Sequence, residues 1–393
     1  MIRLGIVGYG LRSSYLINNS FRKVEPNFKI VSIVDQNEAA ARERLDDHDK
    51  SEVTFYKSLT EMIRKAKPDG LIIGTRCNTH ATLAIEAAKY DIPLFLEKPV
   101  AISMSQALAL EKAFEKSRCK VVVSFPLRVS PLCQFARNLI EQGNIGEPQH
   151  VHAVNYVPYG AVYWEEEYRN YKITQGLFLQ KATHDFDYLS YLMGSPIVRV
   201  AALANYGRVF GGNKPAGLVC SKCSEQDTCL ESPKNRSRYN PADKNLRKDH
   251  PCLYSKDCGS PETGTNEDCS SALLEFASGA HGVYSQVFFA RNDAASRGAI
   301  VSGYNGTISF DWYKNELKHI RHHSPFSDIS KASANMNHFG GDDMLVRNFL
   351  DILLSNAESK TPIRIGLQSV YACLAAKKSA NSGHFVKIRQ VGT

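Results

Sequence analysis

A glycine-rich turn near the start of the chain has the residue types and spacing that bind the phosphates of a dinucleotide. The sequence GYGLRS over residues 8–13 follows the apolar run 3–7 and precedes a helical pattern. In such a turn, Gly8 permits a tight backbone and Gly10 lets a pyrophosphate approach the positive end of the helix. The third glycine position holds Ser13, so we expect helix and strand to lie slightly further apart; a turn without a ligand is the alternative. The residues expected to contact the cofactor here are Gly8, Tyr9, Gly10, Leu11 and Arg12.

A carboxylate at the end of the second apolar run, residues 28–34, indicates which dinucleotide would bind. Asp35 can accept hydrogen bonds from both ribose hydroxyls of the adenosine and would repel a 2′-phosphate. Gln36 and Asn37 follow it, and no adjacent arginine is present to hold that phosphate. The sequence therefore favours NAD over NADP, with Asp35 and Gln36 as ligands. Asp35 could instead, or in addition, cap the next helix.

Several further motifs resemble one family of enzymes. The fifth apolar run ends in Leu96-Glu97-Lys98-Pro99, and with the glycine turn and Asp35 it resembles the Gfo/Idh/MocA family of sugar and inositol oxidoreductases. The family's T-x-x-x-x-H loop resembles residues 75–80, its H-x-x-D helix resembles residues 184–187, and the sequence HFGGD over residues 338–342 is similar to the family too. The resemblance spans nearly the whole chain except a cysteine-rich insert. It implies cofactor contacts from Thr75, Asn78, His80, Glu97 and Lys98.

The resemblance also assigns the chemistry. In proteins that the chain resembles, the lysine of E-K-P lies beside the nicotinamide and the substrate hydroxyl, which assigns Lys98 here. A buried lysine next to a cationic nicotinamide would have a lowered pKa and could relay a proton at neutral pH. His184 would be the partner acid or base. Without the motifs, Lys98 would be interpreted as a surface lysine and His184 as a structural histidine.

One position departs from the family pattern. Related dehydrogenases often carry an aspartate four residues before the histidine, where this chain has Gln180, which cannot accept a proton. Lys181 follows it, three residues before His184, and its ammonium could reach the same pocket. We therefore count Lys181 with Lys98 and His184 as catalytic, and Gln180 as a substrate ligand.

Three more residues are candidates for binding the substrate. Arg128 resembles the family arginine at the substrate mouth and could hold a hydroxyl or a carboxylate. Asp187 lies one helical turn from His184 and could orient its imidazole or bind a substrate hydroxyl. Tyr159 belongs to an aromatic group, with Tyr156, Tyr163 and Trp164, that could stack on a sugar or could equally be core or dimer surface.

Three functions are compatible with these residues. The first is an NAD-dependent dehydrogenase that transfers hydride between a hydroxyl carbon of a sugar, sugar acid or cyclitol and nicotinamide. The second keeps NAD without net redox: a glycoside or an anhydro or sialic-type sugar is oxidised transiently, undergoes elimination, hydrolysis or rearrangement, and is reduced again. The Gln180–Lys181 departure suits this reaction. The third is a non-catalytic NAD-binding regulator, against which the retention of Lys98 and His184 argues.

The order of sequence patterns predicts two kinds of sheet. Up to residue 125, apolar runs at 3–7, 28–34, 70–74, 93–96 and 120–123 alternate with helical patterns at 38–46, 58–65, 79–89 and 105–117. This alternation predicts a Rossmann domain over 1–125, with a doubly wound parallel sheet. Residues 126–393 are expected to form an α+β domain for substrate binding and oligomerisation. Its strands, predicted at 150–156, 198–206, 272–276, 282–288, 307–311 and 316–321, would form a large, mostly antiparallel open sheet, with a hairpin turn at 278–280 and helices at 344–354 and 367–380.

The insert at about 209–267 is rich in Gly, Pro, Ser and Asn and is expected to lack regular structure. Six of the ten cysteines lie between Cys220 and Cys269, and five of these six belong to the insert. Cys220 and Cys223 have the spacing of metal ligands, but no second C-x2-C pair follows. We expect this insert to be a loop with reduced thiols and to bind no metal. A small zinc or iron–sulfur site formed by Cys220, Cys223, Cys229 and Cys252 is the alternative.

The composition of the chain excludes several other classes of protein. The chain has 393 residues, of which 43% are hydrophobic and 22% charged, so it is not a mainly disordered protein. The net charge of +8 is dispersed, with no polybasic tail, and we expect no nucleic-acid partner. No apolar run reaches the roughly 18 residues of a membrane span, and the first residues do not form a signal peptide. We therefore expect a cytoplasmic protein that pairs into a homodimer or homotetramer through its second sheet, as the resemblance implies.

Overall fold

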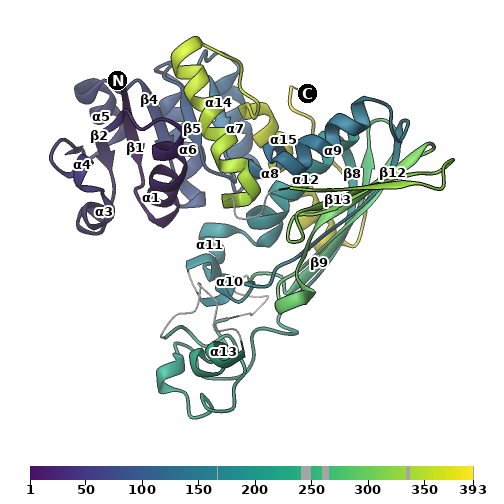
Figure 1. Cartoon of the computed structure of the whole chain (residues 1–393). Coiled ribbons are helices and arrows are strands. Elements are labelled where there is room, and N and C mark those ends of the chain that lie inside the picture. The colour runs from purple at the N-terminus through teal and green to yellow at the C-terminus, as the bar shows by residue number, and fades with distance from the viewer. Residues whose placement is uncertain (166, 240–248, 259–264, 333–336, 393) are drawn as a thin grey trace.

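The computed structural model describes residues 1–393 except 166, 240–248, 259–264, 333–336 and 393 (Figure 1). A six-stranded parallel sheet forms the N-terminal part, in the order β3-β2-β1-β4-β5-β6. Its strands are β1 (Ile2–Val7), β2 (Phe28–Val34), β3 (Thr54–Phe55), β4 (Gly70–Ile73), β5 (Leu94–Leu96) and β6 (Val121–Val123). This is the strand order of the Rossmann fold, and it confirms the predicted parallel sheet. Only β3 was not predicted, because a two-residue edge strand carries no recognisable pattern.

Helices cover both faces of this sheet. They are α1 (Leu11–Leu16), which continues through a π-helical turn (Ile17–Phe21) into α2 (Arg22–Val24), and α3 (Glu38–Arg44), α4 (Asp47–Lys50), α5 (Leu59–Ala66), α6 (Cys77–Ala87) and α7 (Met104–Phe114). Serine side chains cap two of them, since Ser58 and Ser103 each accept a hydrogen bond from a backbone N–H in the first turn. The cap of α3 is Asn37, so the alternative role of Asp35 as a helix cap is wrong.

A nine-stranded sheet forms the second part, in the order β14-β13-β12-β11-β7-β10-β9-β8-β15. Only the neighbours β7 and β10 run parallel, which confirms the mostly antiparallel open sheet. The predicted hairpin turn at 278–280 joins β9 to β10. The strands are β7 (Pro148–Tyr156), β8 (Ile197–Asn205), β9 (Cys269–Phe276), β10 (His281–Val287), β11 (Ser296–Gly303), β12 (Gly306–Asp311), β13 (Glu316–Arg321), β14 (Ser327–Lys331) and β15 (Val386–Lys387).

Three of these strands were not predicted, and one of them, β11, lies inside the sheet. Its first residues, Ser296, Arg297 and Gly298, interrupt the apolar alternation, although Arg297 and Gly298 are both buried. Gly298 is required there, because a Cβ atom would lie 1.8 Å from the carbonyl oxygen of Phe310 on β12. The strands β14 and β15 are short and polar and lie at the two edges.

One face of the large sheet is covered by helices and the other is not (Figure 1). The helices of this part are α8 (Pro126–Val129), α9 (Pro131–Glu141), α10 (Val162–Glu165), α11 (Tyr171–Thr174), α12 (Thr183–Met193), α13 (Pro233–Tyr239), α14 (Gly341–Ser355) and α15 (Ile363–Ser382). Of these, α9, α12 and α15 pack on the sheet. Leu203, Leu273 and Ile300 on the sheet strands remain exposed. Oligomerisation through this sheet stays a prediction.

The helix α14 crosses back to the parallel sheet, although it lies far beyond that sheet in the sequence. Its Phe349 makes edge-to-face contacts with Phe21 and Phe95, at centroid distances of 6.1 and 5.8 Å. Leu345, Val346 and Phe349 belong to the same hydrophobic cluster as β1 and β2. The last helix, α15, packs mainly on β8 and α12 of the second part, and also touches α7.

The insert has some regular structure, contrary to expectation. Residues 233–239 form α13, which lies in the part of the chain farthest from both sheets in Figure 1. The insert segments 240–248 and 259–264 lie outside the described residues. None of the helices in the described part of the chain is long and apolar enough to cross a membrane.

Candidate active site

The glycine turn has the geometry of a phosphate cradle. Gly8 has a φ of +84°, and a Cβ atom there would lie 2.8 Å from Thr75. Gly10 faces open space, with no heavy atom within 4 Å of where its Cβ would be. No side chain caps the N-terminus of α1, so its first N–H groups point into that space. These residues fit the pyrophosphate of a dinucleotide. Leu11 beside them is exposed.

The serine at the third glycine position fits because a glycine lies opposite it, after β4. Ser13 is buried, and its hydroxyl donates to the carbonyl of Gly8 at 2.7 Å. A Cβ atom on Gly74 would lie 2.2 Å from the same hydroxyl oxygen. Gly74 after β4 therefore supplies the space that a glycine at position 13 would have left.

Asp35 lies beside this turn with its carboxylate partly exposed. One oxygen accepts from the backbone N–H of Tyr9 at 2.7 Å and the other from Asn37 at 2.8 Å. These bonds fix the carboxylate at the end of β2, where the adenosine ribose lies in a Rossmann fold. Tyr9 itself contributes only backbone, since its side chain is buried in the core, and Gln36 is exposed to solvent.

Lys98 follows β5 and reaches across to the second part of the chain. Its ammonium donates to the backbone carbonyl of Gln180 at 2.8 Å. Burial, and after it the nearby charge of Lys181, lowers the pKa of Lys98 to about 8. Lys98 can therefore be protonated or neutral near physiological pH.

Three predicted cofactor ligands, His80, Thr75 and Asn78, form hydrogen bonds that hold the loops around Lys98. His80 is buried, with its ring nitrogens 2.8 Å from the carbonyl oxygen of Pro99 and 3.0 Å from that of Thr75. It thus ties the loop after β4 to the segment that carries Lys98. The Thr75 hydroxyl hydrogen-bonds to that of Thr79, and the carbonyl of Asn78 accepts from Gln106.

A second network fixes the other side of this loop. The guanidinium of Arg12 pairs with Glu97 at 2.9 Å and with the buried Asp342 at 2.7 Å. Burial alone would raise the pKa of Asp342, but its contacts with His338 and Arg12 hold it well below its usual range. The side chains of Arg12 and Glu97, both predicted to contact the cofactor, therefore join α1, the Lys98 loop and α14 to one another.

Lys181 lies on a π-helical turn, Phe178–Ala182, directly before α12. Its ammonium donates to the Tyr159 hydroxyl at 3.0 Å and lies over the rings of Tyr159 and Tyr163. Burial raises the pKa of Tyr159, but the positive charges of Lys181 and Arg297 outweigh it, so the pKa is lowered overall. Tyr159 is half-buried while Lys181 is almost fully buried. The phenol is therefore the more accessible member of this pair.

His184 is the most electrostatically constrained residue of the site. It is buried on α12 against the ring of Phe125, and its Nδ1 has no hydrogen-bond partner among the described residues. Burial, followed by the charges of Lys98 and Arg297, holds the pKa of His184 well below its usual range. Its imidazole is therefore neutral at physiological pH.

A buried network beneath His184 was not predicted. Asp185 pairs with Arg297 of β11 at 2.8 Å and accepts hydrogen bonds from Asn155 and Tyr284. The sequence placed Asp185 beside His184, but nothing in it identified Arg297, because β11 itself was not recognised. This network anchors α12 to the large sheet.

Arg128 and Asp187 bind each other. The guanidinium donates to both carboxylate oxygens, at 2.7 to 3.0 Å, and both side chains are largely buried. Arg128 also lies over the ring of Tyr191 at 4.6 Å. Asp187 does not bind Nδ1 of His184, so its predicted role in orienting that imidazole needs correction. Because each side chain already binds the other, a substrate group would have to displace this ion pair to reach either residue.

Gln180 contributes its backbone rather than its amide to the site. Its side chain donates to the sulfur of Cys77 at 3.2 Å and to the carbonyl of Thr174 at 3.3 Å. The amide therefore bridges α6 and α11, which departs from the predicted contact with substrate.

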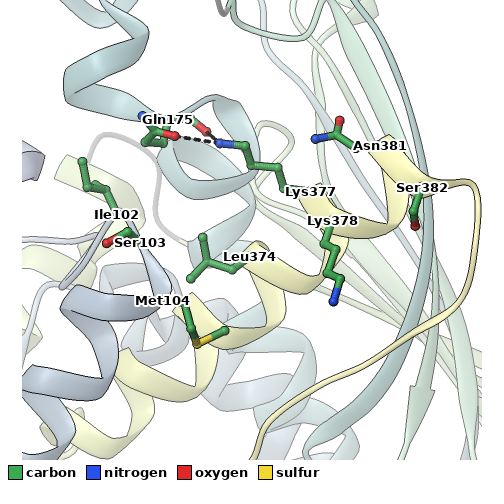
Figure 2. Close-up of a pocket in the computed structure, with 9 residues that line it drawn as sticks. All are labelled: Ile102, Ser103, Met104, Gln175, Leu374, Lys377, Lys378, Asn381 and Ser382. Atoms are coloured by element: carbon green, nitrogen blue, oxygen red, sulfur yellow. Dashed lines mark hydrogen bonds between the residues drawn. The ribbon is translucent and has the colours of Figure 1, made fainter.

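A separate surface cavity of about 460 Å³ lies between the start of α7 and the end of α15 (Figure 2). Lys377, Lys378, Asn381 and Ser382 of α15 line one side of it. The ammonium of Lys377 donates to Gln175, as Figure 2 shows. Neither Lys98 nor His184 lines this cavity, so it is distinct from the candidate active site.

A dinucleotide turn on a Rossmann sheet, with a lysine and a histidine where that sheet meets a second one, defines a protein with an NAD(P)-binding Rossmann domain. Comparison with known proteins agrees. Residues 2–125 match the oxidoreductase family with an NAD-binding Rossmann fold, and residues 133–309 match the GFO/IDH/MocA C-terminal domain. The chain belongs to the Gfo/Idh/MocA family.

Individual relatives are distant. A scyllo-inositol 2-dehydrogenase (NAD(+)) from Bacillus subtilis (strain 168) is 27% identical over 212 residues, 53% of this chain and 58% of that protein. A 2,7-anhydro-N-acetylneuraminate hydratase from Escherichia coli (strain K12) is 26% identical over 201 residues, 49% of this chain and 50% of that protein. The matched region spans 41% to 58% of the length of the first three curated relatives.

One solved structure, a levoglucosan dehydrogenase in complex with NADH and levoglucosan, has a TM-score of 0.73. It is 17% identical, and the match covers 99% of this chain and 100% of the other. At this identity the likeness concerns the fold alone.

Proposed function

We propose that the protein uses NAD to transfer hydride between nicotinamide and a hydroxyl-bearing carbon of a sugar, sugar acid or cyclitol. The observation that carries the proposal is Lys98, whose ammonium has a lowered pKa and follows the carboxyl end of β5. Ligands of open parallel sheets bind at such strand ends. The name of one relative, a scyllo-inositol 2-dehydrogenase, supports a cyclitol or sugar as substrate.

Asp35 supports NAD over NADP. Its carboxylate is fixed by two backbone N–H groups and remains partly exposed at the end of β2. A negative charge held there favours two ribose hydroxyls and disfavours a 2′-phosphate. The nicotinamide, when bound, accepts or donates the hydride.

The residues of this chain would manage the proton. In the oxidation direction, neutral Lys98 takes the proton from the substrate hydroxyl as hydride leaves its carbon. His184, neutral and buried, holds the same hydroxyl by a hydrogen bond. The buried pair of Asp185 and Arg297 keeps α12, and so His184, in place.

The charge of the site favours a substrate that carries a carboxylate. Lys98 and Lys181 hydrogen-bond to uncharged groups, the carbonyl of Gln180 and the hydroxyl of Tyr159. Neither has a carboxylate partner among the described residues. The positive charge of Lys181 beside a neutral histidine would bind an anion, also when Lys98 is in the neutral form that accepts the proton. Within the proposed class, a sugar acid therefore suits the site best.

The test is an activity screen with matched variants. Purified protein with NAD is given inositols, neutral sugars and sugar acids, and the absorbance of NADH is followed. A steady rise with one substrate, lost in Lys98→Met and kept in Lys378→Met, supports the proposal. Lys378 is an exposed lysine and serves as the control. Tight NAD binding without NADH or product from any substrate would overturn it and favour a regulator.

The pair of Lys181 and Tyr159 favours a second candidate, transient oxidation without net redox. A ketone formed in the substrate acidifies the neighbouring C–H. A Tyr159 phenolate, favoured by the lowered pKa, could take that proton while Lys181 stabilises the resulting enolate. Loss of a leaving group from the adjacent carbon, followed by return of the hydride, would complete the reaction. One relative, named a hydratase, is consistent with such chemistry.

Isotope exchange separates the two candidates. In deuterated water, the second candidate exchanges the hydrogen beside the transient ketone in recovered substrate and changes the product without accumulating NADH. Tyr159→Phe would abolish this exchange while hydride transfer persists. Stoichiometric NADH without exchange would exclude the second candidate.

A further inference from the structure

Four cysteines of the insert line a single cavity. Cys220, Cys223, Cys229 and Cys252 surround a space of about 280 Å³, its opening to solvent included. Three of them are buried and Cys229 is partly exposed. All four are free thiols. Cys258 and Cys269, the other cysteines of this region, do not line the cavity.

The backbone brings these cysteines together from two segments. Cys223 donates its N–H to the carbonyl of Cys220 at 3.1 Å, which closes the C-x2-C turn. An antiparallel bridge between Val219 and Pro251 then places that turn against Cys252. The turn and the bridge therefore bring cysteines from two segments of the insert to the same cavity.

This part of the chain has no apolar core. Between Gly211 and Pro251, the buried apolar side chains of the described residues are Cys220 and Cys223 alone. The hydrophobic cluster nearby takes Phe210 and Leu253 from either side and none of the residues between them. A module of this kind needs another source of stability, and a metal centre is a common one.

The cavity does not suit a single ion. Among the described residues, no three Cys, His, Asp or Glu side chains meet as the ligands of one ion would. His250 also lines the cavity, but its two ring nitrogens lie 2.9 Å from the carbonyl of Pro251 and 3.2 Å from that of Glu231. Both nitrogens are therefore engaged with backbone. Four thiols around a hollow, rather than around a point, are the ligand set of a polynuclear centre.

We propose that Cys220, Cys223, Cys229 and Cys252 bind an iron–sulfur cluster of the [4Fe–4S] type. Lys214 supports this assignment, because its ammonium lies 3.6 Å from the sulfur of Cys223. A positive group at this place offsets the negative charge that thiolates bring to such a cluster.

The cluster would act on the active site through the insert. Arg236 of α13 forms a buried ion pair with Glu165 of α10. The short helix α10 also carries Tyr163, whose ring faces Lys181. An insert held together by the cluster therefore supports Tyr163 beside Lys181. Loss of the cluster would displace Tyr163 first.

The test is the metal content of the full chain purified without oxygen, and after reconstitution with ferrous iron and sulfide. We expect about four iron and four acid-labile sulfide per chain, with broad visible absorption. Cys220→Ser and Cys223→Ser should lose most of both, whereas Cys269→Ser should keep them. Cys269 is a matched control, since it lies beside the insert and outside the cavity.

Two outcomes overturn the proposal. One zinc per chain with no sulfide would show a single-ion site. A well-folded chain, by circular dichroism, that takes up neither iron nor sulfide would show a plain thiol cluster. Because both are read on the unmutated protein, an unstable cysteine variant does not leave the question open.

Discussion

The ammonium of Lys98 lies 2.8 Å from the backbone carbonyl of Gln180, and this bond joins the parallel sheet to the helix that carries His184. A neutral carbonyl orients the ammonium without a full negative charge. A carboxylate partner would have raised the pKa of Lys98, whereas here burial and Lys181 lower it to about 8. The contact with Gln180 therefore fixes the position of Lys98, while burial and Lys181 set its proton chemistry.

Lys98 should set the pH dependence of oxidation. Because the neutral amine accepts the hydroxyl proton, kcat/KM should rise with pH and level off above about 8. Lys98→Arg stays cationic at every accessible pH, so its kcat/KM should be about 10² to 10⁴ lower and lack this limb. A pH profile of the unmutated protein without any limb between 7 and 9 would exclude Lys98 as the acceptor.

His184 should make the fold sensitive to acid. Its folded-state pKa lies well below 6.5, so below about pH 6.5 the unfolded chain binds a proton that the folded chain refuses. The free energy of unfolding should then fall by about 1.4 kcal/mol per pH unit from this residue. Urea unfolding at pH 7.0 and 5.5 measures the effect. The unfolding free energy of His184→Gln should depend less steeply on pH. The exposed His384→Gln is the control, and an equal slope in all three proteins would contradict the assignment.

The pair of Arg128 and Asp187 should be worth more to stability than to binding. Asp187→Ala leaves a buried guanidinium without its partner and should cost about 3 to 5 kcal/mol in unfolding free energy. Replacing both residues by Leu should recover a large part of that loss. A variant that unfolds normally but shows a greatly raised substrate KM would instead restore the predicted substrate role.

Asp35 should determine the choice of cofactor. Asp35→Ser removes a charged acceptor of ribose hydrogen bonds, and NADH affinity should fall about tenfold to a hundredfold. NADPH affinity should rise, because the repulsion of its phosphate is relieved. Fluorescence titration with both cofactors measures this, with Gln36→Ala as the neighbouring exposed control. Tighter binding of NADPH than NADH by the unmutated protein would exclude the proposal.

Gly74 and Ser13 should behave as a coupled pair. Gly74→Ala places a methyl 2.2 Å from the Ser13 hydroxyl and should cost about 1 to 3 kcal/mol. In a Ser13→Gly background the same change should cost much less, because the clash is gone. Thermal unfolding of the four proteins gives the coupling energy, and strictly additive losses would argue against the compensation.

The sequence predicts most of the architecture, and the failures have physical causes. Buried parallel strands are continuous apolar runs, so five of the six in the first sheet are recognisable. The strand β11 is not, because Arg297 and Gly298 are buried for reasons that lie on other strands: the carboxylate of Asp185 and the close backbone of β12. Polarity at those two positions resembles a loop when only neighbours in sequence are considered.

The sequence predicts which residues form the candidate site better than it predicts which partners those residues bind. Motifs identify Lys98 and His184, the spacing to His184 adds Lys181, and the structure places all three within electrostatic reach of one another. Spacing along a helix cannot show that Asp187 is already bound by Arg128 from another helix, or that both nitrogens of His80 face carbonyls. Which partner satisfies a buried polar group first is a property of tertiary packing.

The return of α14 to the parallel sheet has a consequence for synthesis. Residues 1–125 leave the ribosome long before Phe349, which covers Phe21 and Phe95. Until then, this aromatic surface and the guanidinium of Arg12 lack their final cover. The nascent Rossmann half therefore exposes hydrophobic surface while more than half of the chain is still being made. Its cofactor site is complete only after α14 has been synthesised and has packed on the sheet.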